Sequence, residues 1–67
     1  MKIYKCGTEV IIKNIDIVGY ITAVIIRFNN VTYEISYFLN NIYYQSWFNE
    51  IEFELKNKVE KINIGFT

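Results

Sequence analysis

The sequence contains no histidine, a single cysteine and only three glycines. Without histidine it lacks the usual base for proton transfer near neutral pH, and Cys6 has no imidazole to activate its thiol. The same shortage excludes a closed zinc site, and Gly7, Gly19 and Gly65 lie too far apart to form a phosphate-binding loop. We therefore expect no catalytic residue, metal, cofactor or small-molecule substrate, and we expect Cys6 to be a small packing side chain.

Charge of one sign and long apolar runs are also missing. Seven basic and seven acidic residues give a net charge of zero, so no overall field concentrates a polyanion near the chain. No apolar run approaches the ~18–20 residues of a membrane span, and the first ten residues lack the layout of a secretory signal. We expect a soluble cytoplasmic protein with no membrane partner.

Aromatic residues are abundant in a chain that is too short for a large core. A chain of 67 residues removes only about 60% of its unfolded surface from water. Six tyrosines, five phenylalanines and one tryptophan contribute to a hydrophobic content of 52%. A few such rings can anchor a small core. Part of the apolar content should stay exposed, which favours a protein partner or self-association.

The middle of the sequence alternates between apolar and polar residues, the pattern of strands with one buried side. Val31, Tyr33, Ile35 and Tyr37 fall on one face of such a strand. From residue 19 to 28 both faces are apolar, which predicts a central or sharply bent strand, with Gly19 able to supply a bulge or kink. Five strands are predicted at residues 9–13, 19–28, 31–38, 42–47 and 51–55.

Short breaks separate these strands. Asn29-Asn30 and Asn40-Asn41 each predict a tight type I′ hairpin turn, because asparagine tolerates the positive φ that both central positions require. Residues 48–50 interrupt the alternation and predict one 3₁₀ turn. No helical periodicity is present. The fold class predicted is all-β, a small five-stranded barrel in which closure protects the sheet edges.

The last residues divide from this domain. We assign residues 1–55 to the barrel and 56–67 to a C-terminal tail. The tail is rich in lysine at first and then carries Val59, Ile62, Ile64 and Phe66 at regular spacing. It forms either an added or swapped strand or a frayed terminus.

Several short motifs carry a resemblance to a known family. They are V-x-I near the start, then G-Y-I-T-A-V, Y-E-I-S-Y and W-F-N-E-I-E-F, and together they span residues 8–55. The chain resembles small SH3-like β-barrels of the Tudor and KOW type and is similar to short proteins of bacteriophages and prophages. The resemblance implies an interaction module encoded by a phage, located in the host cytoplasm or the virion, that binds peptides, modified side chains or nucleic acid.

The resemblance also implies a recognition surface built from aromatic residues. The candidates are Tyr20, Tyr37, Tyr43, Tyr44 and Trp47, with Arg27 added as a basic residue beside aromatic strands. Tyr43 and Tyr44 are adjacent, so they point to opposite faces of a strand. For the pair Trp47 and Phe48, we expect Phe48 in the core and Trp47 partly exposed. Assembly into a cage for a cation, with Glu50 at its rim, is one alternative.

Three functions stay open at this stage. The leading prediction is a non-catalytic module that binds a protein partner or itself, as an accessory component or a homo-oligomer. The second is a nucleic-acid-associated module that uses dispersed basic residues: Lys2, Lys5, Arg27, Lys56, Lys58 and Lys61. Acidic residues equal them in number, and Glu50, Glu52 and Glu54 are predicted to form a negative row along one strand. The third is inhibition of a host protein.

Overall fold

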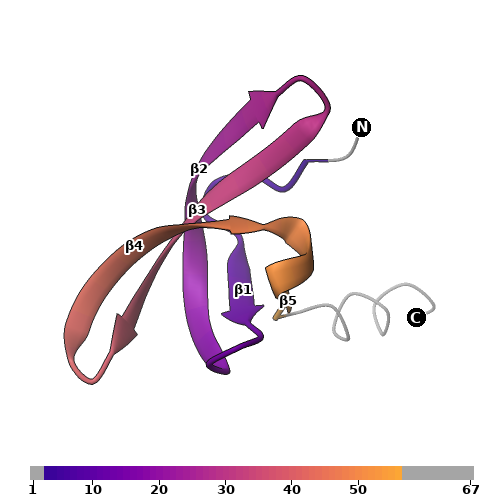
Figure 1. Ribbon diagram of the computed structural model, residues 1–67. Coiled ribbons are helices and arrows are strands. Elements are labelled where there is room, and N and C mark those ends of the chain that lie inside the picture. Colours follow the sequence, from indigo (N-terminus) through magenta and orange to yellow (C-terminus); the bar gives the residue numbers. More distant parts are fainter. Residues whose placement is uncertain (1–2, 57–67) are drawn as a thin grey trace, which may run out of the picture.

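Five antiparallel strands form one sheet in the computed structural model, which describes residues 3–56 (Figure 1). The elements are β1 (Glu9–Ile12), β2 (Ile17–Arg27), β3 (Asn30–Leu39), β4 (Ile42–Asn49), the 3₁₀ turn η1 (Glu50–Glu52) and β5 (Phe53–Leu55). Strands β1 to β4 follow one another in the sheet, and β5 returns to pair with β1, giving the order β4-β3-β2-β1-β5. The all-β class and the number of strands predicted from the sequence are confirmed.

The sheet bends like a small barrel but is not closed. Within residues 3–56, the paired strands end at β4 on one side and at β5 on the other. In Figure 1 the β2–β3 hairpin projects upward and the β3–β4 hairpin curves to the lower left, while β1 and β5 lie near the centre. Two edge strands therefore remain, and they differ in length and in charge.

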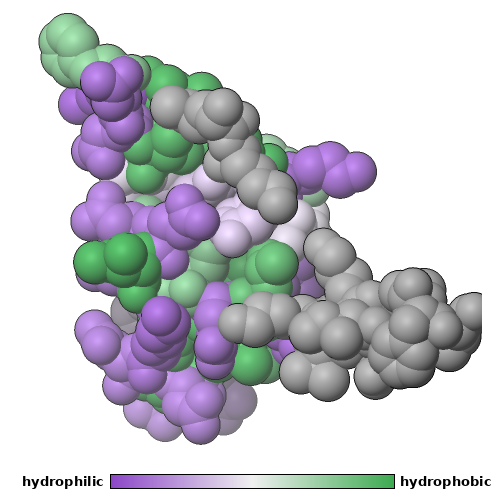
Figure 2. All heavy atoms as spheres, turned by 90° about the vertical axis from the view of Figure 1, so that its right-hand side faces the viewer, coloured by the Kyte–Doolittle hydropathy of each residue, from purple (hydrophilic) through white to green (hydrophobic). Residues whose placement is uncertain are grey.

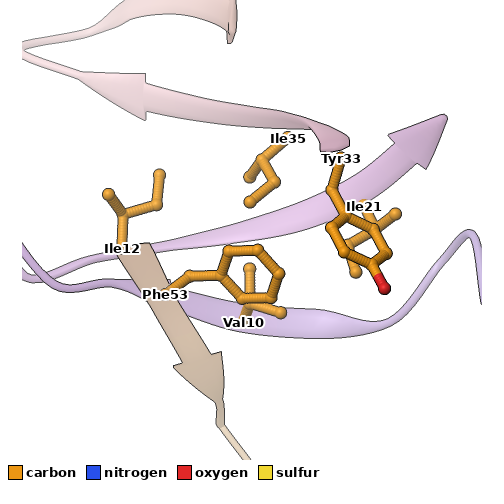
Figure 3. Packing of buried hydrophobic residues seen from close by; sticks show 6 residues of the cluster. All are labelled: Val10, Ile12, Ile21, Tyr33, Ile35 and Phe53. Atoms are coloured by element: carbon orange, nitrogen blue, oxygen red, sulfur yellow. The ribbon is translucent and has the colours of Figure 1, made fainter. Parts of the chain in front are cut away.

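The core lies on the inner face of the bend and is small (Figure 3). Its buried members come from four of the five strands: Val10, Ile12, Ile21, Tyr33, Ile35 and Phe53. The rings of Tyr33 and Phe53 meet edge to face with centroids 5.4 Å apart. The backbone N–H of Tyr4 donates a hydrogen bond to the buried Tyr33 hydroxyl at 3.3 Å. Two aromatic rings thus fill space that small aliphatic side chains could not.

Strand β2 is central, as its apolar character on both faces predicts, since it pairs with both β1 and β3. The register shifts between Ile21 and Ala23, so Thr22 forms a bulge, and Gly19 does not. A glycine is required at this buried position for another reason. A Cβ there would lie 2.7 Å from Ile35 Cγ2 and 2.8 Å from Ser36 O, so only glycine permits this close approach of β2 and β3.

The two hairpin turns differ. Asn40 and Asn41 have φ values of 54° and 66°, which confirms the predicted type I′ turn between β3 and β4. The prediction of a turn at Asn29-Asn30 is wrong, because Arg27 pairs with Asn30 and leaves Phe28 and Asn29 in the loop. Of these two, only Phe28 has positive φ, at 54°, the pattern of a type II′ turn.

Three further local predictions are wrong. The 3₁₀ turn covers Glu50–Glu52 and so lies two residues later than the predicted 48–50, because the Glu52 side chain accepts a hydrogen bond from the N–H of the N-cap residue Asn49 at 2.6 Å. Ile51 is therefore outside β5 and 80% exposed, and the three glutamates do not form a row along one strand. Cys6 is exposed, so it does not pack in the core.

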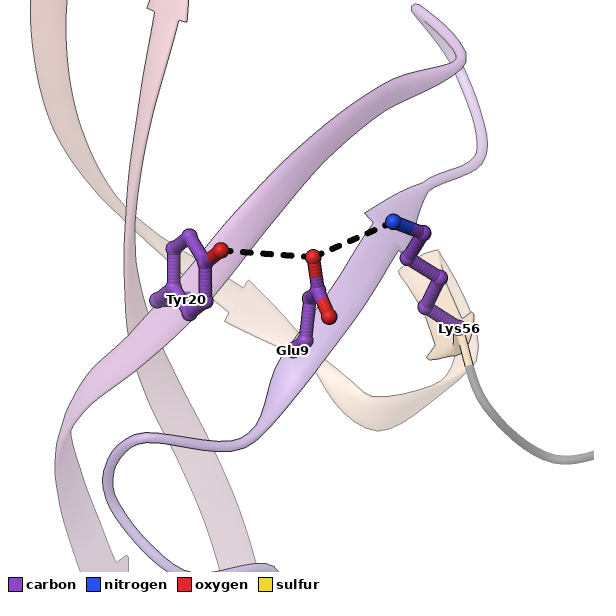
Figure 4. A network of polar contacts seen from close by, with 3 residues as sticks. All are labelled: Glu9, Tyr20 and Lys56. Atoms are coloured by element: carbon purple, nitrogen blue, oxygen red, sulfur yellow. Dashed lines mark hydrogen bonds and ion pairs between the residues drawn. The ribbon is translucent and has the colours of Figure 1, made fainter. Parts of the chain in front are cut away.

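The end of β5 is attached to β1 at Glu9. The Lys56 N–H donates to the Glu9 carbonyl at 3.2 Å, and the Lys56 ammonium forms an ion pair with Glu9 Oε2 at 3.2 Å (Figure 4). The added or swapped strand was predicted for the tail at residues 56–67, of which residues 57–67 lie outside the described residues. Between residues 3 and 56, no helix has the length and apolar character needed to cross a membrane.

Candidate interaction surface

A shallow depression on the outer face of the sheet brings together two of the six candidate residues. Its volume is about 250 Å³, and it is lined by Ile25, Arg27, Asn30, Thr32 and Trp47. The register explains the grouping, because Ile25 pairs with Thr32 and Arg27 pairs with Asn30 across the β2–β3 hairpin. The indole of Trp47 comes from β4, where the side chain is 46% exposed. Apolar, cationic and amide groups thus meet in one place.

Charge around this depression is mixed. Arg27 is the only formally charged residue that lines it. Glu34 lies beside it, directly opposite Trp47 in the β3–β4 pair. The hydroxyl of Thr22 donates to Glu34 Oε1 at 2.9 Å. A carboxylate next to the indole disfavours phosphate and suits a neutral or mixed-charge surface of another protein.

The tip of the β2–β3 hairpin next to this depression is apolar. Phe28 is fully exposed at the turn, and Ile26, whose side chain points to the other face, is 52% exposed. Figure 2 shows apolar side chains near the upper end of the molecule, where Figure 1 places this hairpin. The ring of Phe28 is wholly exposed to water and contributes no packing to the core. Exposed aromatic residues of this kind often anchor interfaces.

Tyr37 and Tyr44 lie on the inner face instead, next to the core. Their rings are stacked with centroids 5.4 Å apart and planes at 18°, and Phe48 meets Tyr37 at 6.2 Å. Phe48 packs against the buried cluster, as predicted, while its neighbour Trp47 is partly exposed on the outer face. These two tyrosines therefore extend the core toward the β3–β4 hairpin.

Tyr43 and Tyr20 lie apart from these groups. Tyr43 is on the outer face opposite Phe38, with ring centroids 5.3 Å apart, and both rings are exposed. Tyr20 pairs with Glu9, and its hydroxyl donates to Glu9 Oε2 at 3.3 Å (Figure 4). The candidate aromatic residues are thus divided between two faces and do not assemble into one cage.

Glu50, which we expected at the rim of a cage, belongs to η1 and lies beside Tyr4. Burial raises the pKa of the Tyr4 phenol above its ordinary value of 10.0, and the hydrogen bond and negative charge of Glu50 raise it further. Both residues line a second depression of about 360 Å³ with Lys13, Ile51, Phe53, Glu54 and Leu55. Across residues 3–56, no three histidine, cysteine, aspartate or glutamate side chains come together as metal ligands.

No family model, curated protein or solved structure matches this chain. The resemblance to SH3-like barrels and to bacteriophage proteins therefore stays a prediction. Sequence reasoning missed several residues of the exposed apolar surface, above all Phe28 and Phe38. The position of Phe38 could have been predicted from the Asn40-Asn41 turn, because a two-residue hairpin places Phe38 opposite Tyr43.

Proposed function

We propose that this chain is a non-catalytic protein-interaction module, an SH3-like accessory component that binds another protein or a second copy of itself. One observation carries the proposal. Arg27 and Trp47 line the outer depression, and the fully exposed Phe28 follows Arg27 directly at the β2–β3 turn. Arginine and the large aromatic residues, tryptophan above all, are the residues that most often anchor protein interfaces.

The same surface indicates the chemistry of the partner. Ile25 and Trp47 offer apolar contact, while Asn30 and Thr32 offer hydrogen bonds to a peptide backbone. Arg27 supplies one positive charge, which suits a single carboxylate at the edge of an apolar patch. A protein segment with an apolar anchor next to one acidic residue matches this arrangement. An inhibitor of a host protein would use the same surface.

Capture of a partner from a lysate of a candidate host, with and without nuclease, tests this function. We expect a discrete protein to be retained after nuclease treatment by the unchanged chain and lost by Phe28→Asn and by Arg27→Gln. Asparagine accepts the positive φ of residue 28, so Phe28→Asn removes the ring without straining the turn.

The matched control is Ile51→Asn. It also removes a large exposed apolar side chain, but from η1, away from the depression. Equal capture by all four proteins would exclude this surface as the binding site. Loss of all captured material on nuclease treatment would exclude a protein partner.

The second candidate function is nucleic-acid association. Arg27 next to the Trp47 indole provides a cation beside a stacking platform, the combination that single-strand binders use. Glu34 opposite Trp47 opposes it, as does the pairing of Lys56 with Glu9. Affinity for an oligonucleotide that falls steeply with salt would favour this candidate, because neutralised phosphates release counterions.

A further inference from the structure

The two edges of the open sheet are protected very differently. Strand β5 has three residues, carries Glu54 and is followed by Lys56. Strand β4 has eight residues, IYYQSWFN, with no charged residue and no proline. Natural sheets shorten an edge strand or place charges on it, because its unpaired N–H and C=O groups otherwise accept another strand. Only β5 has this protection.

The absence of charge extends beyond β4 itself. From residue 35 to 49 the sequence has no acidic or basic side chain, which covers the second half of β3, the turn and all of β4. Strand β4 also lies at one edge of the sheet, paired only with β3 among the described strands. Figure 1 shows its first half along the left-hand border of the molecule. Nothing in residues 3–56 pairs with its second side.

We infer that this edge pairs with β4 of a second copy, antiparallel, so that two sheets join into one across a two-fold axis. The inference deepens the proposed function and rests on it, since it names the surface and the partner for self-association. An antiparallel edge is complementary to itself, because its alternating donors and acceptors match those of its own two-fold copy. With no charge on β4 and a net charge of zero, neither the edge nor the whole chain repels its copy.

The faces of the sheet restrict the register. A two-fold axis perpendicular to the sheet keeps the outer face continuous, so residues opposite each other must come from the same face of β4. Tyr43, Gln45 and Trp47 share the outer face. Placing Gln45 opposite its own copy puts Tyr43 of each protomer opposite Trp47 of the other. Aromatic cross-strand pairs of this kind stabilise a sheet.

The turn geometry supports the same register. In a two-residue hairpin the closing pair, here Leu39 and Ile42, is hydrogen-bonded, and such pairs alternate along the strands. The backbone groups of Tyr44 therefore face β3, whereas those of Tyr43, Gln45 and Trp47 face the free edge. The three residues that the register pairs are thus the ones with free backbone donors and acceptors.

The area available is sufficient for a weak dimer. Phe38, Tyr43 and Trp47 are 63%, 52% and 46% exposed on the outer face. At about 200 Å² for each aromatic side chain, they leave about 300 Å² of apolar surface per protomer uncovered. Counted on both copies, this is about 600 Å² at most, in the range of weak, transient interfaces.

Sedimentation equilibrium of the full chain, from about 1 µM to about 1 mM, covers the affinities of such small interfaces. We expect a monomer–dimer equilibrium. Gln45→Lys and Gln45→Glu should each weaken the dimer on the order of ten-fold or more, because the register places like charges opposite each other at the axis. An equimolar mixture of the two variants should dimerise again, as lysine then faces glutamate. Asn29→Lys, an exposed change in the β2–β3 turn, should leave the dimer unchanged.

Three results would overturn the inference. A strict monomer over the whole range means that the edge takes a strand of a different protein or none. A dimer unaffected by Gln45→Lys means that the copies meet elsewhere, which leaves the proposed function standing. A mixture of lysine and glutamate variants that stays monomeric excludes this register. Because the capture experiment uses Phe28 and Arg27, its failure is distinguishable from failure at β4.

Discussion

The small core makes one matched pair of substitutions informative: Ile35→Val and Ile26→Val. Both remove one methylene from an isoleucine in the β2–β3 pair, but Ile35 is fully buried and Ile26 is half exposed. At Ile35 the change loses both transfer free energy and packing, which costs about 1 kcal/mol of the free energy of unfolding. At Ile26 no cavity forms, and the cost is about 0.3 kcal/mol.

These costs are large for a chain of this length. At about 0.05–0.15 kcal/mol per residue, the total free energy of unfolding is about 3–10 kcal/mol. For a urea m-value of about 1 kcal/mol per molar, Ile35→Val lowers the unfolding midpoint by about 1 M, and Ile26→Val lowers it by about 0.3 M. The thermal midpoint of Ile35→Val should fall by about 4–8 °C.

The assay is urea unfolding followed by far-ultraviolet circular dichroism and by Trp47 fluorescence at one fixed protein concentration. Fixing the concentration matters because association stabilises the folded state. Equal midpoint shifts for the two variants would refute the reasoning, since they would show that the inner face at Ile35 is no better packed than the exposed hairpin. An increased m-value would point to a change in the unfolded state instead.

Two further predictions concern Gly19 and Tyr4. Gly19→Ala should destabilise the fold by about 1–3 kcal/mol, measured by the same urea assay, because the new Cβ meets Ile35 and the Ser36 carbonyl; unchanged stability would contradict this contact. The raised pKa of Tyr4 implies stability that is complete below pH 10.0 and lost as pH rises through the raised value. Tyr4→Phe should reduce this alkaline loss between about pH 9 and 12 relative to the unchanged chain, whereas an identical pH profile would exclude Tyr4 as its cause.

The sequence predicts the elements that depend on local patterns. Alternation in β3 correctly places Tyr33 and Ile35 in the core, and Asn40-Asn41 forms the turn that its chemistry favours. The turn between β2 and β3 lies one residue earlier than predicted, and the bulge lies at Thr22 instead of Gly19. An extra residue in β2 resets which side chains face inward, and it is chosen by the fit of three strands, which no local pattern contains.

The candidate site was only partly predictable, for a related reason. Residue type identified Arg27 and Trp47, and the cross-strand registers bring them to one depression. Tyr37 and Tyr44 have the same residue type as Tyr43, yet they stack on the inner face. Which face each aromatic residue occupies depends on the register, so composition alone could not separate the rings that support the core from those left exposed.

The pairing of β5 with β1 has a consequence for the order in which the chain folds. The two tight hairpins join neighbouring strands and can form early, whereas Phe53 reaches Ile12 only after a long loop has closed. Until residues 53–55 leave the ribosome, β1 has a free side and the aromatic cluster around Tyr33 lacks one of its rings. Folding of this domain during synthesis must therefore wait for β5, and the uncharged part of the β3–β4 hairpin, residues 35–49, is exposed to other chains during that interval.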